Sequence, residues 1–407
     1  MSNLLTTIGS IADIFDGPHA TPLKTGIGPF FLSISSLENG RLDLSKSAHL
    51  GEEDFKKWAK RVTPRKGDLL FSYETRLGES ALMPGGIRAC LGRRMGLLRP
   101  RSDKVIPEYL LYAYLSPAFQ QTIVANTITG ATVNRIALNE MPNFPIRIPG
   151  LEEQKKVAGL LKDLDAMIDC NNSINSELEA MAKTLYGYWF VQFNFPDANG
   201  KPYKSNGGKM VYNSTLNREI PAGWKDKQLS QIANITMGTS PSGDSLNNSG
   251  DGVEFFQGST DFGWQFPTVR QYTTQPARMA KRGDILLSVR APVGDLNVAH
   301  IDCCIGRGLA ALNSRDGFDG FLFYVMQYLK TIFDRRNGEG TTFGSITKDD
   351  LHSLPLAYPP SDLLKKYNDI VSRYNQMIFT RSMGNQKLAQ LRDWLLPLLM
   401  NGQVTVK

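Results

Sequence analysis

The amino-acid sequence contains one internal repeat, and this repeat constrains the fold more than any other feature. Gly130-Ala131-Thr132 recurs as Gly340-Thr341-Thr342, and the same offset pairs Lys155-Lys156 with Lys365-Lys366. Slightly larger offsets match further segments: Lys66–Ser72 with Arg282–Ser288, and Cys90–Arg93 with Cys304–Arg307. A globular domain followed by a helix and then duplicated is expected to fold with approximate two-fold symmetry if the two helices pair antiparallel.

Length and composition predict a globular protein of more than one domain. The 407 residues suffice for two or more hydrophobic cores, and 41% hydrophobic with 21% charged residues is an ordinary globular composition. No apolar run approaches the roughly 20 residues of a membrane span, and the N-terminus lacks a charged segment followed by an apolar one. We therefore expect a cytoplasmic protein without membrane association. The four cysteines form no C-x-x-C pair, so no metal site is expected.

The distribution of charge is uneven between the two copies. The net charge of +7 and the pI of about 9.1 favour a polyanionic partner. Residues 1–150 hold 18 Lys and Arg against 13 Asp and Glu, a net of +5, whereas residues 222–358 hold 13 against 14, a net of −1. If the second copy binds nucleic acid, it must do so through a local basic patch.

Two long helices are predicted from apolar residues that alternate at spacings of three and four. The first seam contains Val157, Leu160, Leu164, Met167, Asn171, Ile174, Leu178, Met181, Leu185 and Tyr188. The second contains Tyr367, Ile370, Tyr374, Met377, Arg381, Gly384, Leu388, Leu391, Leu395 and Leu398. A 3.5-residue period over more than four heptads is typical of a coiled coil, and the shared polar position, Asn171 or Arg381, would fix the register. The alternative is that each helix packs only on its own domain.

The sequence divides into two globular domains, two helices and a linker. We expect domains at 1–150 and 224–358, long helices within 151–193 and 359–407, and a Gly- and Pro-rich linker at 194–223. Each domain should have a mixed α/β (α+β) fold that is rich in strands and loops. The expected strands are at 30–34, 68–72, 253–257 and 284–288, and short helices are expected at 108–115 and 321–330.

Sequence signatures of catalysis are missing. The chain has no G-x-x-x-x-G-K-[ST] loop, no G-x-G-x-x-G after a strand and no clustering of its four histidines. Glu153-Gln154-Lys155 matches the end of a nuclease E-x-K pattern, but it lies at a helix start, where Glu also complements the helix dipole. Arg76 and Arg290 are instead candidates for phosphate or base contacts, because Arg can bind either in a bidentate manner. Surface salt bridges are the alternative for both.

The ordered and duplicated motifs resemble one known family over essentially the whole chain. They are Thr129-Gly130-Ala131-Thr132 with Ile136, Pro145–Pro149, Leu151–Val157, Trp189-Phe190, Phe195-Pro196, Gly200–Tyr203, Gly207–Met210, Glu219–Pro221 and Gly223-Trp224. In this order they resemble the specificity subunit of type I restriction-modification systems. The second copy departs from the pattern where Ser361-Asp362-Leu363-Leu364 replaces the Leu-Glu-Glu-Gln of the first copy.

The resemblance implies a DNA-binding subunit without a catalytic centre. Two target-recognition domains would each read one half of a split, asymmetric site in double-stranded DNA, and an antiparallel pair of coiled-coil helices would set the unread spacer. Two methyltransferase subunits, which bind S-adenosylmethionine, would dock on the helices, and two ATP-driven, Mg-dependent restriction subunits can join them. This chain itself would hold no cofactor and no metal.

The resemblance and the repeat together give two sets of candidate residues. The DNA-facing set is Arg76, Arg93, Arg94 and Thr132, with Arg290, Arg307, Thr341 and Thr342 as their equivalents in the second copy. The helix-pairing or partner-binding set is Leu164, Met167, Asn171, Ile174, Leu178, Met181, Leu185, Met377, Arg381, Leu388, Leu391 and Leu395. The alternative function is a two-domain protein-binding scaffold without DNA contact, which the acidic balance of the second domain favours.

Overall fold

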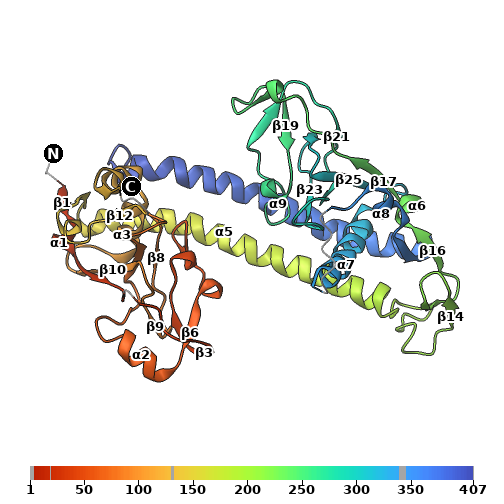
Figure 1. The fold of residues 1–407 in the computed structure, drawn as a ribbon, viewed down its shortest axis with the longest axis horizontal. Helices are drawn as coiled ribbons and strands as arrows, with labels where there is room; N and C mark the ends of the chain where they lie inside the picture. Colours follow the sequence, from red (N-terminus) through yellow and green to blue (C-terminus); the bar gives the residue numbers. More distant parts are fainter. Residues whose placement is uncertain (1–3, 19, 130–132, 339–344, 407) are drawn as a thin grey trace. The chain divides into compact units, whose positions relative to one another are not determined.

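The computed structural model describes residues 4–18, 20–129, 133–338 and 345–406, without the side chains of 331–338. The chain forms two compact units. The first unit consists of Met1–Cys170 and Gly384–Lys407, and the second of Asn171–Met383. Both long helices, α5 (Leu151–Tyr186) and α9 (Ser361–Met400), cross the boundary between the units, and Figure 1 shows their length. Each unit therefore contains part of each helix.

The first unit is built on a four-stranded antiparallel sheet. Its strand order is β2 (Ala12–Asp16), β10 (Met95–Pro100), β7 (Leu69–Ser72) and β8 (Ser80–Leu82). Leu69 and Phe71 of β7 join the core that contains α3 (Pro107–Leu115), whereas Leu70 joins a smaller core on the other face. Because successive side chains of a strand point to opposite faces, a strand covered on both sides reads as a continuous apolar run.

Smaller elements complete the first unit. A three-stranded sheet has the order β6 (Ala48–Leu50), β3 (Lys24–Phe31), β9 (Ala89–Cys90), with β3 and β9 parallel. The two-stranded sheets are β1 (Leu5–Thr7) with β13 (Pro145–Arg147), β4 (Leu37–Glu38) with β5 (Arg41–Leu42), and β11 (Thr127–Ile128) with β12 (Arg135–Ile136). The remaining helices are α1 (Ile8–Ile11), α2 (Glu52–Trp58) and α4 (Pro117–Ala125), with 3₁₀ turns η1 (Ile34–Ser36), η2 (Leu44–Lys46) and η3 (Met141–Asn143).

The second unit repeats this arrangement. Its four-stranded sheet has the order β17 (Ala233–Met237), β25 (Leu309–Ser314), β22 (Ile285–Ser288), β23 (Leu296–Val298). A five-stranded sheet has the order β18 (Leu246–Asn247), β20 (Gln271–Thr273), β19 (Val253–Phe256), β24 (Cys303–Ile305), β21 (Met279–Ala280). Strand β16 (Lys225–Gln228) pairs with β26 (Pro355–Tyr358). The other helical elements are α6 (Leu229–Ile232), α7 (Asp319–Gly338), α8 (Lys348–Ser353), η5 (Gly243–Ser245) and η6 (Ser259–Asp261).

The internal repeat predicted from the sequence is confirmed at the level of single strands. The two four-stranded sheets share one strand order, and β3 pairs with β9 in parallel as β19 pairs with β24. Helices α5 and α9 begin at equivalent positions of the repeat, Leu151 and Ser361. The mixed α/β class is likewise confirmed. The short helix expected at 108–115 is present as α3, whereas the one expected at 321–330 is longer than predicted, since α7 spans the 20 residues Asp319–Gly338.

The segment predicted as a loop-like linker is more ordered than expected. It contains a hairpin of β14 (Met210–Asn213) and β15 (Arg218–Pro221). The ring of Phe195 stacks on Tyr203 with centroids 4.7 Å apart and on Trp224 at 5.4 Å. Helix α5 itself ends in a π-helical turn, η4 (Gly187–Val191). Gly and Pro content indicated turns correctly, but it did not reveal the aromatic contacts that order them.

Each unit contains specific contacts between its parts of α5 and α9. In the first unit the guanidinium of Arg392 lies 2.7 Å from the Asp165 carboxylate, and the Asn385 amide donates to the Ile168 carbonyl at 3.4 Å. In the second unit the Asn175 amide donates to Ser382 Oγ at 3.2 Å. All three contacts involve half-buried or buried groups. The two helices therefore contact each other as well as the sheet domains, which contradicts the alternative that each packs only on its own domain.

The buried stripe of both helices differs from the predicted seam by one residue at every second position. The structure buries Leu161, Ile168, Asn175 and Ala182 of α5, and Val371 and Ile378 of α9. The predicted positions Met167, Met181, Met377 and Leu391 are 53%, 51%, 39% and 42% exposed. Positions three and four residues apart lie on one helix face, so apolar spacing could not choose between the two sets. Leu164 and Leu178 are buried as expected, and Asn171, Ile174, Leu185, Arg381, Leu388 and Leu395 are half-buried.

The corrected stripe can be tested with neighbouring residues in α9. Ile378→Ala should lower the free energy of unfolding by about 2–5 kcal/mol, because Ile378 is fully buried beside Leu178 and Phe266. Met377→Ala is the matched control and should cost under about 1 kcal/mol, as expected for an exposed site. Urea unfolding of both variants measures the difference. Equal losses in the free energy of unfolding would favour the seam predicted from the sequence, which contains Met377.

Candidate nucleic-acid interface

One turn in each unit presents arginine on a closely packed backbone. It joins β9 to β10 in the first unit and β24 to β25 in the second, and it carries Arg93 and Arg307 at equivalent positions. A Cβ added at Gly306 would lie 2.8 Å from Gln257 Oε1, and one added at Gly308 would lie 2.6 Å from the Gln257 carbonyl oxygen. Glycine is required here because the backbones approach too closely for a side chain. The turn is thereby fixed, while Arg307 remains exposed.

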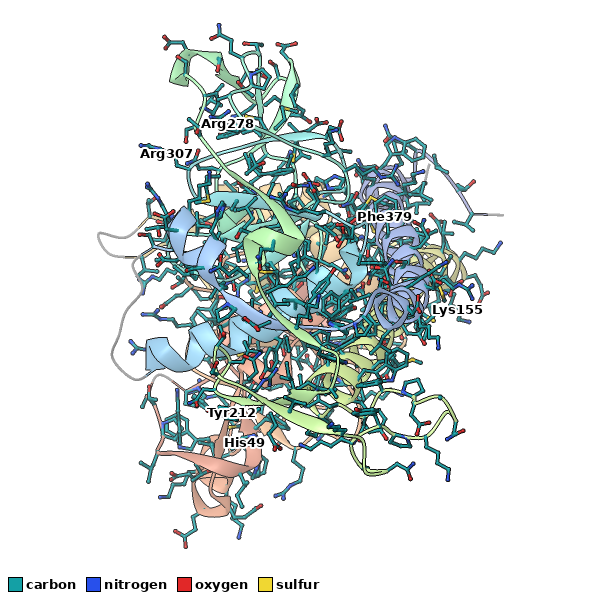
Figure 2. The ribbon with its side chains drawn as sticks, turned by 90° about the vertical axis from the view of Figure 1, so that its right-hand side faces the viewer. His49, Lys155, Tyr212, Arg278, Arg307 and Phe379 are labelled. Carbon is teal, nitrogen blue, oxygen red and sulfur yellow. The ribbon has the colours of Figure 1, made fainter. Side chains whose placement is uncertain are left out.

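In the second unit, three exposed arginines lie on connected backbone segments. Ile305 donates its backbone N–H to the carbonyl of Arg278 at 2.9 Å, and Val289 donates to the carbonyl of Gly308 at 2.9 Å. These bonds bring Arg278 and Arg290 next to the turn that carries Arg307, and Figure 2 shows Arg278 and Arg307 in the same region. Within the described part of the chain, no ion pair involves these three guanidinium groups. Arg278 was missed in the sequence, because no motif marks the short strand β21.

Several acidic side chains of the second unit accept hydrogen bonds from the backbone of that unit. The Asp261 carboxylate accepts a hydrogen bond from the backbone N–H of Gln257 at 2.8 Å. The Asp284 carboxylate accepts one from the backbone N–H of Lys281 at 2.9 Å. Burial raises the pKa of the Asp319 carboxyl, whose oxygen accepts from the Ser314 N–H. Among the described residues, none of these carboxylates pairs with Arg278, Arg290 or Arg307, so exposed arginines are present although residues 222–358 have a net charge of −1.

In the first unit, two of the candidate arginines are held by acidic neighbours. Arg76 donates to the Ile34 carbonyl at 3.3 Å and to Glu79 Oε1 at 3.4 Å. Arg94 Nε lies 2.8 Å from Glu74 Oε2. Arg93 is exposed. The candidates Thr132, Thr341 and Thr342 lie outside the described residues.

The structure corrects one predicted equivalence between the copies. The backbone of Glu74 bridges to Arg135, and the backbone of Arg290 bridges to Ser345. The repeat places Arg135 and Ser345 at equivalent positions, so Arg290 corresponds to Glu74 and not to Arg76. Aligning Arg76 with Arg290 relied on residue type, whereas the register of paired segments fixes the correspondence. The equivalence of Arg93 with Arg307 stands, since each follows the glycine of a matched Cys-x-Gly-Arg segment.

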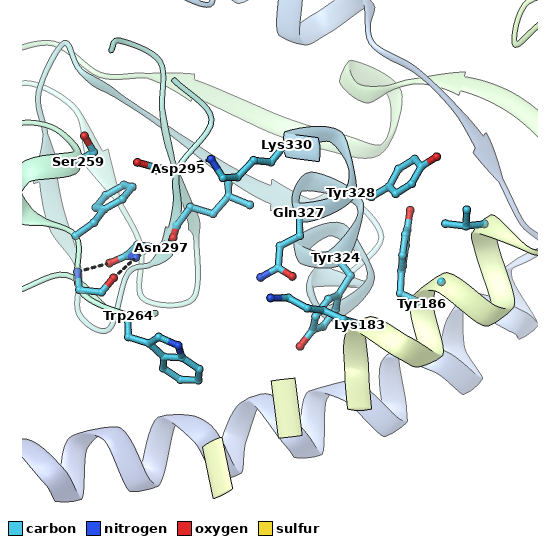
Figure 3. A pocket seen from close by; sticks show the side chains of 15 residues that line it. Lys183, Tyr186, Ser259, Trp264, Asp295, Asn297, Tyr324, Gln327, Tyr328 and Lys330 are labelled. Carbon is cyan, nitrogen blue, oxygen red and sulfur yellow. Dashed lines mark hydrogen bonds and ion pairs between the residues drawn. The ribbon is translucent and has the colours of Figure 1, made fainter. Parts of the chain in front are cut away.

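A cavity of about 700 Å³ in the second unit has the size of a ligand site. Figure 3 shows Trp264, which is 55% exposed, across from Lys183 and Gln327. Lys183 pairs with Glu179 at 2.8 Å, and Lys330 pairs with Asp295 at 2.9 Å. The charged groups are thus used in ion pairs, and the lining provides no nucleophile next to a general base among the described side chains. We assign no chemistry to this cavity.

The described residues contain no group of three or more His, Cys, Asp or Glu side chains that could hold a metal ion. They also contain no helix with the length and apolarity to span a membrane.

These features define a class of internally duplicated α/β proteins. In each copy, the candidate site is a turn that carries an exposed arginine. The family model described as "Type I restriction modification DNA specificity domain" matches residues 23–180 and again 221–391, and the chain belongs to this family. The duplication seen in the sequence and in the strand order therefore corresponds to two copies of one known domain.

Individual relatives agree with this assignment. The putative type I restriction enzyme MjaX specificity subunit of Methanocaldococcus jannaschii is 32% identical, with 97% of this chain and 91% of the relative covered. The type I restriction enzyme HindI specificity subunit of Haemophilus influenzae is 22% identical, with 84% and 87% covered. The crystal structure of a type I restriction-modification system S subunit from M. genitalium matches at a TM-score of 0.57 and 16% identity, covering 97% of this chain and 95% of that one, and supports the fold alone.

Removal of one exposed arginine should weaken DNA binding. Arg307→Ala and Arg290→Ala are each expected to lower affinity by about 1–3 kcal/mol if the lost contact is to a base. For a phosphate contact, the loss should be uniform across sequences, and the slope of log affinity against log salt should fall by about 1. Fluorescence anisotropy at several salt concentrations distinguishes the two. Lys204→Ala removes an equal charge from an exposed position in the linker and serves as control. Unchanged affinity and salt slope would remove the residue from the interface.

Proposed function

We propose that this chain is the sequence-specific DNA-binding subunit of a type I restriction-modification complex, and that each unit reads one half of a split DNA site. The carrying observation is the duplicated domain, which matches the specificity-domain family twice and presents an exposed arginine at the same turn in both copies. The chain contributes recognition and no catalysis. S-adenosylmethionine, ATP and Mg²⁺ act in its partner subunits.

The two halves of the site differ in sequence. The segment after β7 and the turn before β10 carry Glu74, Arg93 and Arg94 in the first unit, and the equivalent positions of the second unit hold Arg290, Arg307 and Gly308. Side chains with different hydrogen-bonding groups select different base edges in the major groove. Two units with the same backbone fold but different side chains at these positions therefore recognise an asymmetric, bipartite DNA sequence.

Helices α5 and α9 form an antiparallel pair that sets the unread spacer. The order of contacts supports this: in the first unit Asp165 contacts Arg392 and Ile168 contacts Asn385, and in the second Ala182 accepts from Tyr367 at 3.2 Å. Positions that advance along α5 meet positions that recede along α9. Buried stripes with a 3.5-residue period on both helices are the geometry of a coiled coil.

The exposed apolar residues of these helices dock the methyltransferase subunits. Met167 and Met377 are equivalent in the repeat and both exposed, as are Met181 and Leu391. Exposed Met residues suit protein interfaces, because their side chains adapt to a partner surface. The two docking patches are therefore Met167 with Leu391 in the first unit and Met181 with Met377 in the second. Two equivalent patches predict two methyltransferase subunits, to which two restriction subunits can add.

The function is tested by purifying the chain with the methyltransferase encoded beside it and mapping methylated adenines in DNA exposed to the complex. We expect a split motif with a fixed unread gap, and a chimaera that receives residues 224–358 from a relative should change one half of that motif. A stable complex without any methylation pattern, or a chain that binds no DNA, would overturn this function and favour a protein-binding scaffold.

The docking patches are tested by placing charge on them. The double variant Met181→Asp with Leu391→Asp should lose methyltransferase binding by at least about tenfold, since a buried unpaired charge costs several kcal/mol at an interface. Its melting temperature should stay near that of the parent, because both residues are exposed. Ser176→Asp with Gln386→Asp adds the same charge at exposed polar positions of the same helices and serves as control. Co-purification is the readout, and full binding by the Met181 and Leu391 variant would exclude these patches.

A further inference from the structure

Two residues of the first unit adopt backbone conformations that are costly for their type. Thr75 has φ 69° and Arg94 has φ 70°. The left-handed region is disfavoured for residues with a Cβ, and most strongly for β-branched ones such as Thr. Thr75 follows strand β7, and Arg94 precedes β10. Costly backbone geometry of this kind persists where surrounding contacts impose it, and such sites cluster at functional centres.

Three contacts that accompany this geometry involve Arg94. Arg94 Nη1 donates to Thr75 Oγ1 at 3.3 Å, and Arg94 Nε lies 2.8 Å from Glu74 Oε2. The Arg94 carbonyl accepts from the N–H of Tyr73 at 3.1 Å. The Arg94 and Glu74 side chains are 32% and 23% exposed. The guanidinium is therefore held in one orientation and half-buried, and among the described contacts the second N–H of Nη1 and both N–H groups of Nη2 remain for a ligand.

Two exposed arginines lie on backbone segments adjacent to this cluster. Thr75 donates its N–H to the Asn134 carbonyl at 3.4 Å, and Glu74 bridges to Arg135 through the backbone. Arg93 is adjacent to Arg94 in the sequence, Arg135 lies opposite Glu74 in the backbone bridge, and both side chains are exposed. An exposed arginine without fixed partners suits phosphates, whereas a base edge requires a donor with a fixed direction.

We propose that Arg94 is the base-reading residue of the first unit, that it contacts the O6 and N7 edge of a guanine, and that Glu74 and Thr75 position it. Guanine is the base whose major-groove edge offers two acceptors to a guanidinium. Because Glu74 and Thr75 order Arg94 before DNA arrives, less side-chain entropy is lost on binding. Arg93 instead contacts phosphate. The inference rests on the proposed function and assigns one base to one residue.

The second unit lacks this arrangement, which makes the assignment specific to one half-site. The positions equivalent to Glu74 and Arg94 hold Arg290 and Gly308. A change at Arg94 should therefore affect discrimination in the half-site of the first unit and leave the other half-site unchanged.

The experiment uses the complex with its methyltransferase partner and duplexes that carry each single base-pair substitution of the mapped motif. Arg94→Lys keeps the charge and removes the planar fork, so discrimination at one G·C pair of one half-site should fall by about tenfold to a hundredfold. The salt slope should be unchanged. Arg93→Lys, at the adjacent residue, is the matched control and should leave discrimination intact at every position.

The positioning residues have their own readout. Glu74→Gln should lower discrimination at the same G·C pair, and Thr75→Gly should do so while the melting temperature stays equal or rises, because glycine accepts a positive φ. Discrimination that survives in both Arg94→Lys and Glu74→Gln would overturn the assignment, as would an equal loss on all duplexes, which indicates a phosphate contact. A parent complex that bound every duplex equally would instead overturn the proposed function and the assignment together.

Discussion

The packing of α5 against α9 is the constraint on which both units depend. Each unit contains part of each helix, so the first unit is not a contiguous stretch of sequence. Its core includes Leu399 and Met400 from the far end of the chain together with Val157 and Leu161. Tyr367, fully buried in the core of the second unit, donates its hydroxyl to the Ala182 carbonyl of the other helix. A change in the buried stripe therefore acts on the sheet domains as well as on the helices.

Duplication preserved the backbone while it allowed the side chains at the turns to diverge. The strand orders of the two four-stranded sheets are the same, and glycine precedes Arg93 and Arg307 alike. The neighbouring positions differ in charge, since Glu74 corresponds to Arg290. In the first unit Glu74 pairs with Arg94, whereas in the second Asp261 and Asp284 accept backbone hydrogen bonds and Arg290 is exposed. Domain net charge is consequently a poor guide to the potential at the candidate interface.

Periodicity and the repeat were sufficient to predict the mixed fold, the two long helices and the place of a shorter helix in each unit, although α7 is longer than expected. They could not fix the helix register, because Met181 and Ala182 lie on adjacent helix positions and burial follows the partner surface. Arg93 and Arg307 were found as candidates through the repeat, and their exposure agrees with such a role. Arg278 was not, since only a backbone hydrogen bond from Ile305 brings it to the turn. The positive φ of Thr75 could not be predicted from the sequence either, because threonine disfavours this backbone conformation.

Both units attach to their helices through apolar cores, but the additional contacts beside those cores differ in chemistry, which bears on how such a protein can change specificity. In the first unit Arg41 pairs with Asp169 of α5 and lies 3.9 Å from Asp165, all at least partly exposed. In the second unit Phe266 packs on Leu178 and Ile378 in an apolar cluster. Exposed ion pairs contribute little to stability and are screened by salt, whereas buried apolar contacts are not. Because the sheet and the buried helix stripe are common to both units, the domain that each helix carries can vary in its loops, and even in its anchoring chemistry, without disturbing the contacts between the helices.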